Sequence, residues 1–180
     1  MKKLISILII FILLFLFGCN SNNNNNDNSK NEDKKADEGY IDFGELVDAD
    51  AKYLYIRKLG DKQLKILLED NDCAKAVLAF AENAPKKEFG LVGPRYHDYY
   101  LSVKCNQSFE HDDKEYTFAV GDVLLSGRNF IVIYDTSSEV STMFCIKIGK
   151  IVGISKEDLK EYFNPETSHG DLAISSILNE

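Results

Sequence analysis

The hydrophobic positions of this 180-residue chain fall into regions with different spacing. Residues 4–17 are apolar except for one serine, residues 20–39 contain no apolar side chain larger than Ala36, and the rest mixes strand-like and helix-like patterns. A segment without apolar side chains cannot bury a core. The predicted regions are a leader (1–18), a disordered Asn-rich linker (19–39), a folded domain (40–165) and a C-terminal extension (166–180).

Alternating apolar and polar positions beyond residue 50 predict antiparallel β-structure. Residues 53–59 and 62–69 are two such runs around Gly60-Asp61, a pair suited to a tight hairpin turn because glycine adopts positive φ angles. Many short strands at close intervals are typical of a β-barrel or sandwich. The further predicted strands are 89–92, 99–104, 116–120, 123–125, 130–134 and 143–148.

Two segments have helical periodicity instead. Asp70-Asn71-Asp72 offers N-cap residues, and small or apolar side chains then recur at helical spacing until Pro85. This predicts an amphipathic helix at about 72–84 that packs on the sheet. Its core-facing side chains would be Cys73, Ala76, Val77, Phe80, Ala81 and Ala84.

A second, shorter helix is predicted near the C-terminus. Ser155 to Asp158 has capping-box spacing, and Asn164-Pro165 stops the pattern, which gives a helix at about 156–163. We predict a further helix in the remaining residues, up to Glu180.

Three ordered landmarks resemble the prokaryotic cyclophilin-like domain family. They are the helix that follows Leu67-Leu68-Glu69 and ends at Pro85, the run Val120-Gly121-Asp122-Val123 before the apolar strand 130–134, and Ile148-Gly149-Lys150-Ile151. The resemblance implies a mainly β fold, a closed or nearly closed β-barrel with one packed helix.

The residues themselves support the same arrangement. Gly121 and Asp122 would turn the chain between strands, and Gly149 would permit a bend or bulge. The chain departs from the family in having no Trp and no Phe-His-Arg-like motif of the isomerase branch. The resemblance therefore supports a fold more than an activity.

The leader ends in Leu16-Phe17-Gly18-Cys19, which resembles the bacterial lipobox. A spanning helix needs about 20 apolar residues, whereas a secretory signal uses about 7–15. We therefore expect cleavage before Cys19 and a lipid on Cys19 that anchors the chain to a membrane. The alternative is an uncleaved anchor. Both place the domain in the cell envelope, outside the cytoplasm.

Charge and metal-ligand patterns exclude several functions. The formal charge is −8, and −10 without Lys2 and Lys3, so the surface favours cationic or neutral partners over nucleic acid. The remaining cysteines, Cys73, Cys105 and Cys145, have no Cys-x-x-Cys spacing, and we expect buried thiols. With scattered histidines and no phosphate loop, we expect neither a metal site nor a cofactor.

Two segments hold clustered polar side chains. The acidic segment Glu110–Glu115 fits a solvated hairpin loop better than a calcium site, which needs several converging oxygens. Residues 94–100 combine a cation, an imidazole and aromatic rings, as binding surfaces often do. The alternative, that Tyr99 is core and Arg95 pairs with nearby acids, is favoured. The candidate ligand-binding residues are Arg95, His97, Tyr100, Arg128 and Phe130.

The resulting hypothesis is a membrane-anchored, cyclophilin-like lipoprotein that binds peptides or small ligands without catalysis. A lipid-anchored peptidyl-prolyl isomerase acting on exported proteins is the alternative, and a surface protein without a ligand is a third. The isomerase would need an Arg beside a proline pocket, and no motif in the chain supplies one. We therefore expect no isomerase activity.

Metabolic labelling with a fatty acid tests the lipid anchor. We expect label on the full chain and none on Cys19→Ala, because Cys19 is the residue at which the apolar run stops. Equal labelling of both chains would contradict the assignment.

Overall fold

The computed structural model describes residues 51–136, 141–167 and 170–178. The leader, Cys19, the linker and His169 lie outside the described residues, so the signal peptide and the lipid anchor stay predictions. No helix within the described ranges is long and apolar enough to cross a membrane.

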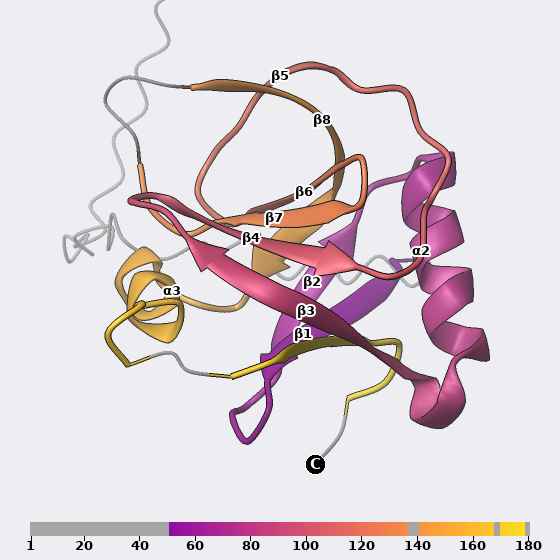
Figure 1. Cartoon of the computed structure of the whole chain (residues 1–180), viewed down its shortest axis with the longest axis horizontal. Coiled ribbons are helices and arrows are strands. Elements are labelled where there is room, and N and C mark those ends of the chain that lie inside the picture. The colour runs from indigo at the N-terminus through magenta and orange to yellow at the C-terminus, as the bar shows by residue number, and fades with distance from the viewer. Residues whose placement is uncertain (1–50, 137–140, 168–169, 179–180) are drawn as a thin grey trace, which may run out of the picture. The chain divides into compact units, whose positions relative to one another are not determined.

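Eight antiparallel strands form a closed barrel in the order β2-β1-β9-β3-β4-β7-β6-β8, and β8 pairs back with β2 (Figure 1). The predicted mainly β, closed barrel is thus confirmed. β5 pairs with the first half of β8, outside the ring. The strands are β1 (Tyr53–Lys58), β2 (Leu64–Leu68), β3 (Glu88–Tyr96), β4 (Tyr100–Cys105), β5 (Lys114–Thr117), β6 (Asp122–Ser126), β7 (Asn129–Ile133), β8 (Thr142–Val152) and β9 (Leu172–Ser175).

The barrel closes where β2 and β8 meet at Gly149. Gly149 pairs with Leu68 on one side and with Val123 on the other. A Cβ atom at this position would lie 2.4 Å from the carbonyl oxygen of Leu67 and 2.8 Å from Cγ2 of Ile66. The β6–β8 register also shifts here, which confirms the predicted bulge. Only glycine lets the two backbones approach this closely.

Alternate residues of the strands fill the barrel. Phe130, Leu101 and Leu125 are fully buried in the main core. The intervening residues of β6 and β7 are also buried, because β5 and the start of β8 cover the outer face of these strands. This second cluster consists of Leu124, Ile131, Ile133 and Cys145, with Tyr100, Tyr116, Phe118 and Met143 packed against it.

The helix α2 (Asp72–Asn83) lies beside the barrel (Figure 1) and confirms the predicted amphipathic helix. The Asn71 side chain caps it by accepting a 2.8 Å hydrogen bond from the Ala74 amide. Its buried residues are Cys73, Ala74, Val77 and Ala81. The prediction of a buried Ala76 is wrong: Ala74 takes that role, since the buried stripe runs along Cys73, Val77 and Ala81 and turns Ala76 outward.

The second predicted helix is α3 (Lys156–Tyr162), capped by the Ser155 side chain. Beyond it, the expected further helix is wrong, because residues 172–175 form β9 between β1 and β3. All four β9 residues are buried. A four-residue strand buried on both faces has no alternation that would distinguish it from a helix.

The β1–β2 turn is longer than the expected two-residue turn and spans Leu59 to Gln63. Gly60 has the expected positive φ of 97°. The Tyr162 hydroxyl accepts a 3.1 Å hydrogen bond from the Lys58 amide and donates a 2.9 Å bond to the Lys62 carbonyl. This side chain therefore satisfies backbone groups that a tight hairpin would pair with each other.

The Gly149 contact predicts a specific loss of stability. Gly149→Ala would force the β2 backbone away from β8, and we expect it to lower the free energy of unfolding by about 3 kcal/mol or to prevent folding. Gly90→Ala on β3 is the control, since a Cβ there meets nothing within 4 Å. Chemical unfolding followed by tyrosine fluorescence measures both. Similar losses in the two variants would contradict this account of the closure.

Candidate functional site

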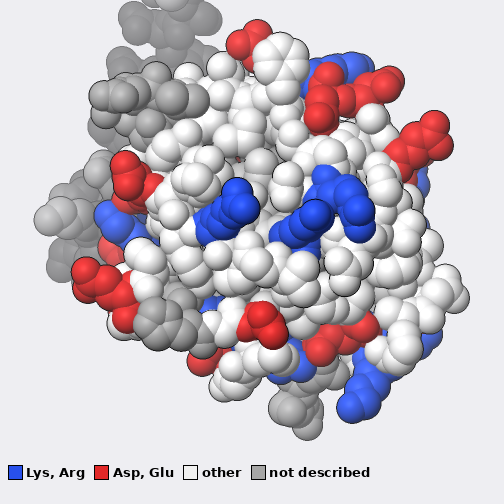
Figure 2. Space-filling view, viewed as in Figure 1, with Lys and Arg blue, Asp and Glu red and all other residues white. Residues whose placement is uncertain are grey.

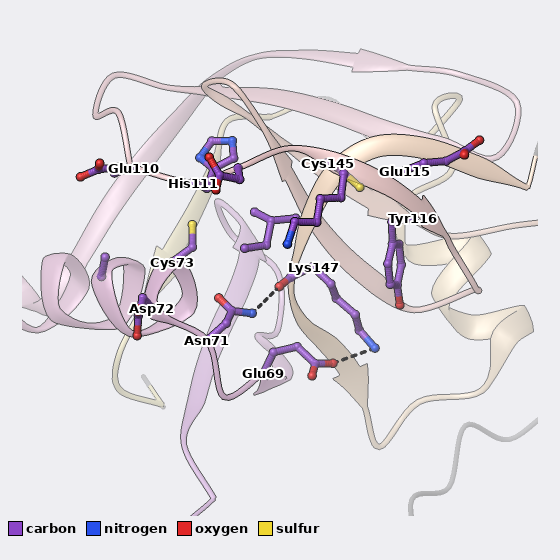
Figure 3. A pocket seen from close by; sticks show the side chains of 14 residues that line it. Glu69, Asn71, Asp72, Cys73, Glu110, His111, Glu115, Tyr116, Cys145 and Lys147 are labelled. Atoms are coloured by element: carbon purple, nitrogen blue, oxygen red, sulfur yellow. Dashed lines mark hydrogen bonds and ion pairs between the residues drawn. The ribbon is translucent and has the colours of Figure 1, made fainter.

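An open cleft of about 1040 Å³ lies where the N-terminus of α2, the segment 110–116 and the middle of β8 come together. Figure 3 shows side chains from all three segments around it. Its lining includes acids, two lysines, a histidine, a tyrosine and two cysteines. The lining residues are Glu69, Asn71, Asp72, Cys73, Ala76, Glu110, His111, Asp112, Lys114, Glu115, Tyr116, Cys145, Ile146 and Lys147.

Asn71 fixes the first turn of α2 against β8. While its side-chain oxygen caps the helix, its amide nitrogen donates a 2.9 Å hydrogen bond to the Lys147 carbonyl (Figure 3). One side chain thus sets both the start of the helix and its distance from the strand. The cleft wall formed by α2 is therefore rigidly placed relative to β8.

Lys147 is bound between two carboxylates beside the cleft. Its ammonium group lies 2.8 Å from Glu69 and 3.2 Å from Asp122. Burial lowers the pKa of Lys147, but the hydrogen bond to Glu69 and the charge of Asp122 outweigh burial and raise it above the usual lysine value. Lys147 therefore stays charged, and its charge is already balanced by the protein.

Asp122 is the buried acid of this network, with 1% of its surface exposed. Its Oδ2 accepts hydrogen bonds from the Ala119 amide at 2.8 Å and from the Tyr116 hydroxyl at 3.3 Å. Gly121, at φ 91°, makes the turn that places Asp122 here, as its position in the sequence predicted. Burial and the Asp122 charge raise the pKa of Tyr116, so its hydroxyl remains a donor.

Cys73 and Cys145 present protonated thiols to the cleft. Burial, followed by the negative charge of Asp113, raises the pKa of each to about 11. Cys105 is also a free, buried thiol. These three cysteines are buried as predicted. No cluster of three or more potential ligands suited to a metal ion occurs within the described ranges.

His111 is held on both ring nitrogens at the edge of the cleft. Nδ1 lies 2.7 Å from the Phe109 carbonyl oxygen, and Nε2 lies 3.0 Å from Oδ1 of Asp113. Only 6% of the His111 side chain is exposed. Phe109 in turn is buried in the core, where its ring packs edge-on against Phe80 and Phe130.

The candidate residues from the sequence lie elsewhere. Arg95, His97 and Tyr100 share the outer face of the β3–β4 hairpin, where the His97 ring stacks on Tyr100 with centroids 4.1 Å apart. Arg128 lies near the opposite end of β4 and donates a hydrogen bond to the Asn106 carbonyl. Phe130 is inside the barrel with no exposed surface. None of these five residues lines the cleft.

The outer face of the hairpin nevertheless carries basic side chains. Figure 2 shows Lys and Arg side chains near the middle of the side viewed in Figure 1, with acidic side chains mainly around its edge. Arg95 is exposed and has no ion-pair partner among the residues that the structure describes, so the expected pairing with nearby acids is not seen there. Tyr99, which that alternative placed in the core, is only half-buried and its ring stacks on Phe118, whereas Tyr100 packs against the second apolar cluster.

Sequence reasoning did not identify the cleft. The segment Glu110–Glu115 was expected to be a solvated loop, and its four acids, Glu110, Asp112, Asp113 and Glu115, are indeed exposed. The structure shows what the local sequence could not, namely that the segment 110–115 faces α2 and β8. The sequence did contain one usable signal, at Gly121-Asp122. An acid at the start of an otherwise apolar strand is expected to be buried, and a buried acid needs a partner.

Comparison of the chain with protein-family models, with curated proteins and with solved structures gave no match. The cleft is therefore interpreted from its own chemistry.

Lys147 gives a test of the network beside the cleft. Lys147→Met leaves the buried Asp122 carboxylate without its cation, and we expect a loss of about 3 kcal/mol in unfolding free energy. Adding Asp122→Asn should recover roughly half of this loss, because the unpaired charge is removed. Lys75→Met, which breaks an exposed pair with Asp70, should cost less than about 1 kcal/mol. Equal losses for Lys147→Met and Lys75→Met would show that the network adds nothing.

The thiol pKa values give a second test. A rise from 9.0 to about 11 lowers the thiolate fraction at pH 8 roughly a hundredfold. Iodoacetamide should therefore modify Cys73 and Cys145 at least that much more slowly in the folded chain than in urea, as measured by peptide mass spectrometry. Comparable rates in both states would contradict their protonated, buried placement.

Proposed function

We propose that this protein is a lipid-anchored binding module of the cell envelope, whose cleft beside α2 takes cationic peptide segments or small cationic ligands. The observation that carries the proposal is the open cleft of about 1040 Å³ with an acidic rim. Pockets of this volume hold a short peptide segment or a small molecule.

The charge of the cleft favours a cation. Five acids line it, against two lysines, and Lys147 is already bound by Glu69 and Asp122. The rim acids Glu110, Asp112 and Glu115 are exposed and available. A ligand ammonium or guanidinium group would replace water at these carboxylates and gain charge-assisted hydrogen bonds.

Part of the lining suits an aliphatic stem. Ala76, Ile146 and the ring of Tyr116 add apolar surface to the cleft that the acids line. Lysine and arginine side chains combine a methylene stem with a charged head, and they bury the stem along such surfaces. A peptide that carries one of these side chains thus matches both parts of the cleft.

The predicted lipid anchor and the family resemblance complete the proposal. The lipobox-like end of the leader and the polar linker would place the barrel near a membrane while leaving it free to capture a segment at a distance. The closed barrel and the packed helix are features that the resemblance to the prokaryotic cyclophilin-like family implied. We assign the chain to that fold type as part of this proposal.

Binding is favoured over prolyl isomerisation by the placement of the arginines. An isomerase of this type would need a guanidinium group beside an apolar proline pocket. Arg95 and Arg128 do not line the cleft, and Arg57 makes a bidentate pair with Glu88. The isomerase alternative thus rests on the family resemblance alone.

Fluorescence anisotropy with a labelled Lys-Ala hexapeptide tests the proposal on the full chain in mild detergent. The triple variant Glu110→Gln, Asp112→Asn, Glu115→Gln should bind about tenfold more weakly, since each exposed charge pair contributes about 0.2–1 kcal/mol. Salt should weaken binding to the parent chain.

The matched control changes the same number of acids away from the cleft. Glu157→Gln, Glu161→Gln, Glu166→Gln alters the net charge equally, so its affinity should stay close to that of the parent. A Glu-Ala hexapeptide should not bind. Equal losses in both triple variants would point to non-specific attraction and would reject the cleft as the site.

A further inference from the structure

The strand β5 has one edge that no other described strand covers. It stands last in the strand order, and among the residues that the structure describes it pairs with β8 alone. The uncovered edge of such a strand presents main-chain N–H and C=O groups with which another extended segment can pair. β5 also borders the cleft, because Lys114, Glu115 and Tyr116 are among the residues that line it.

The pairing with β8 determines which main-chain groups of β5 face the open edge. The Phe118 amide donates a 3.0 Å hydrogen bond to the Ser141 carbonyl, in register with the β5–β8 pairs that precede it. In an antiparallel ladder every second residue bonds to the neighbouring strand, and the residues between them direct their N–H and C=O groups to the opposite side. Counting back from Phe118, the residues between are Thr117 and Glu115. Their main-chain groups therefore face the open edge.

The side chains of β5 give its two faces opposite charges. Successive side chains of a strand point to opposite faces, as Glu115 and Tyr116 do in Figure 3. Glu115 and Thr117 share one face and are exposed, and Phe144, directly opposite Glu115 on β8, is 66% exposed. Lys114 and Tyr116 share the other face. A cationic side chain on a neighbouring strand is attracted by Glu115 on the first face and repelled by Lys114 on the second.

We propose that the open edge of β5 binds a cationic peptide as an added antiparallel strand, paired through the main chain of Glu115 and Thr117. This mode of recognition is known as β-augmentation. The inference rests on the proposed function and deepens it, because it names an extended peptide, rather than a small cation, as the ligand.

The proposal fixes which residues of the peptide bond to β5. Residues directly opposite each other in an antiparallel pair carry their side chains on the same face. The peptide residues that hydrogen-bond to Glu115 and Thr117 therefore have their side chains on the acidic face of β5. These residues are the cationic ones, and the residues between them direct their N–H groups to solvent.

A second copy of the chain is the other segment that can pair with an open edge. Exposed acids lie immediately before β5, at Glu110, Asp112 and Asp113, and Glu115 lies on β5 itself. Two copies paired along β5 would bring these like charges together, which is destabilising, whereas a cationic peptide would neutralise them. The charge around the edge therefore favours the peptide.

Backbone methylation of the peptide tests the added strand in the anisotropy assay with the full chain. Two alternating Lys-Ala hexapeptides carry equal numbers of N-methyl groups, one peptide on its lysines and the other on its alanines. Methylation of the lysines removes the N–H groups that face β5, so this peptide should bind about tenfold more weakly than the unmodified peptide, or weaker still. Methylation of the alanines alters only the solvent side, so this peptide should bind within about threefold of the unmodified one.

The outcomes separate this inference from the proposed function. If the unmodified peptide binds and the two methylated peptides bind equally well, the added strand is rejected while the proposed function stands. If the unmodified peptide does not bind, both are rejected. A peptide weakened only by methylation of its alanines would place the lysines on the wrong face and would also overturn the proposal.

A pair of variants tests the same edge from the side of the protein. Thr117→Pro removes an N–H that faces the open edge and leaves the bonds to β8 in place, as proline on an edge strand allows. We expect it to weaken peptide binding severalfold, whereas Thr117→Ala, which keeps the N–H, should bind like the parent. A dimer of the free chain that Thr117→Pro dissociates, as measured by sedimentation, would place a second copy on the edge and overturn the proposal. The methylated peptides decide the question even if Thr117→Pro does not fold.

Discussion

The contact between β2 and β8 at Gly149 is the constraint on which the rest of the structure depends. The carbonyl oxygen of Leu67 occupies the space where any other residue would carry its Cβ. This approach closes the ring of strands and leaves the first half of β8 free to pair with β5. The same strand therefore seals the main core, covers the second apolar cluster and supplies one side of the cleft.

The cleft is built from charges whose partners come from distant parts of the chain. Lys147 of β8 joins Glu69, which follows β2, to Asp122 at the start of β6. Asn71 joins α2 to the same stretch of β8 through the Lys147 carbonyl. These contacts hold β6, β8 and the first turn of α2 together beside the cleft. The acids of segment 110–115 remain exposed at the rim, so the carboxylates that pair with Lys147 are different from those that face solvent.

The parts of the fold with a repeated local signal could be predicted from the sequence. The hairpin of β1 and β2, the capped helix α2 and the alternating strand β4 each show their period over five or more residues. β9 does not, because Leu172 to Ser175 are buried on both faces and its neighbours, β1 and β3, are remote in sequence. The β1–β2 turn was predicted too short because Tyr162, about a hundred residues away, supplies its hydrogen bonds.

The candidate site was harder to predict than the fold because it depends entirely on contacts between segments that are remote in sequence. Alternation along the β3–β4 hairpin does place Arg95 and His97 on one face, but nothing local shows that the cleft of Figure 3 lies elsewhere. Conversely, the composition of Glu110–Glu115 is that of any solvated loop. Its position opposite Cys73 and Cys145 follows from strand order, which is a property of the whole chain.

The place of β9 has a consequence for how the molecule is made. It lies between β1 and β3, two early strands, yet it is the last described strand to leave the ribosome. Until then both neighbours present unpaired edges, and the ring cannot close. Vectorial synthesis thus yields an incomplete sheet with non-local pairings still to form, which folds slowly. Such a delay leaves the open edges of β1 and β3 exposed to pairing with other strands for as long as the C-terminal strand is missing.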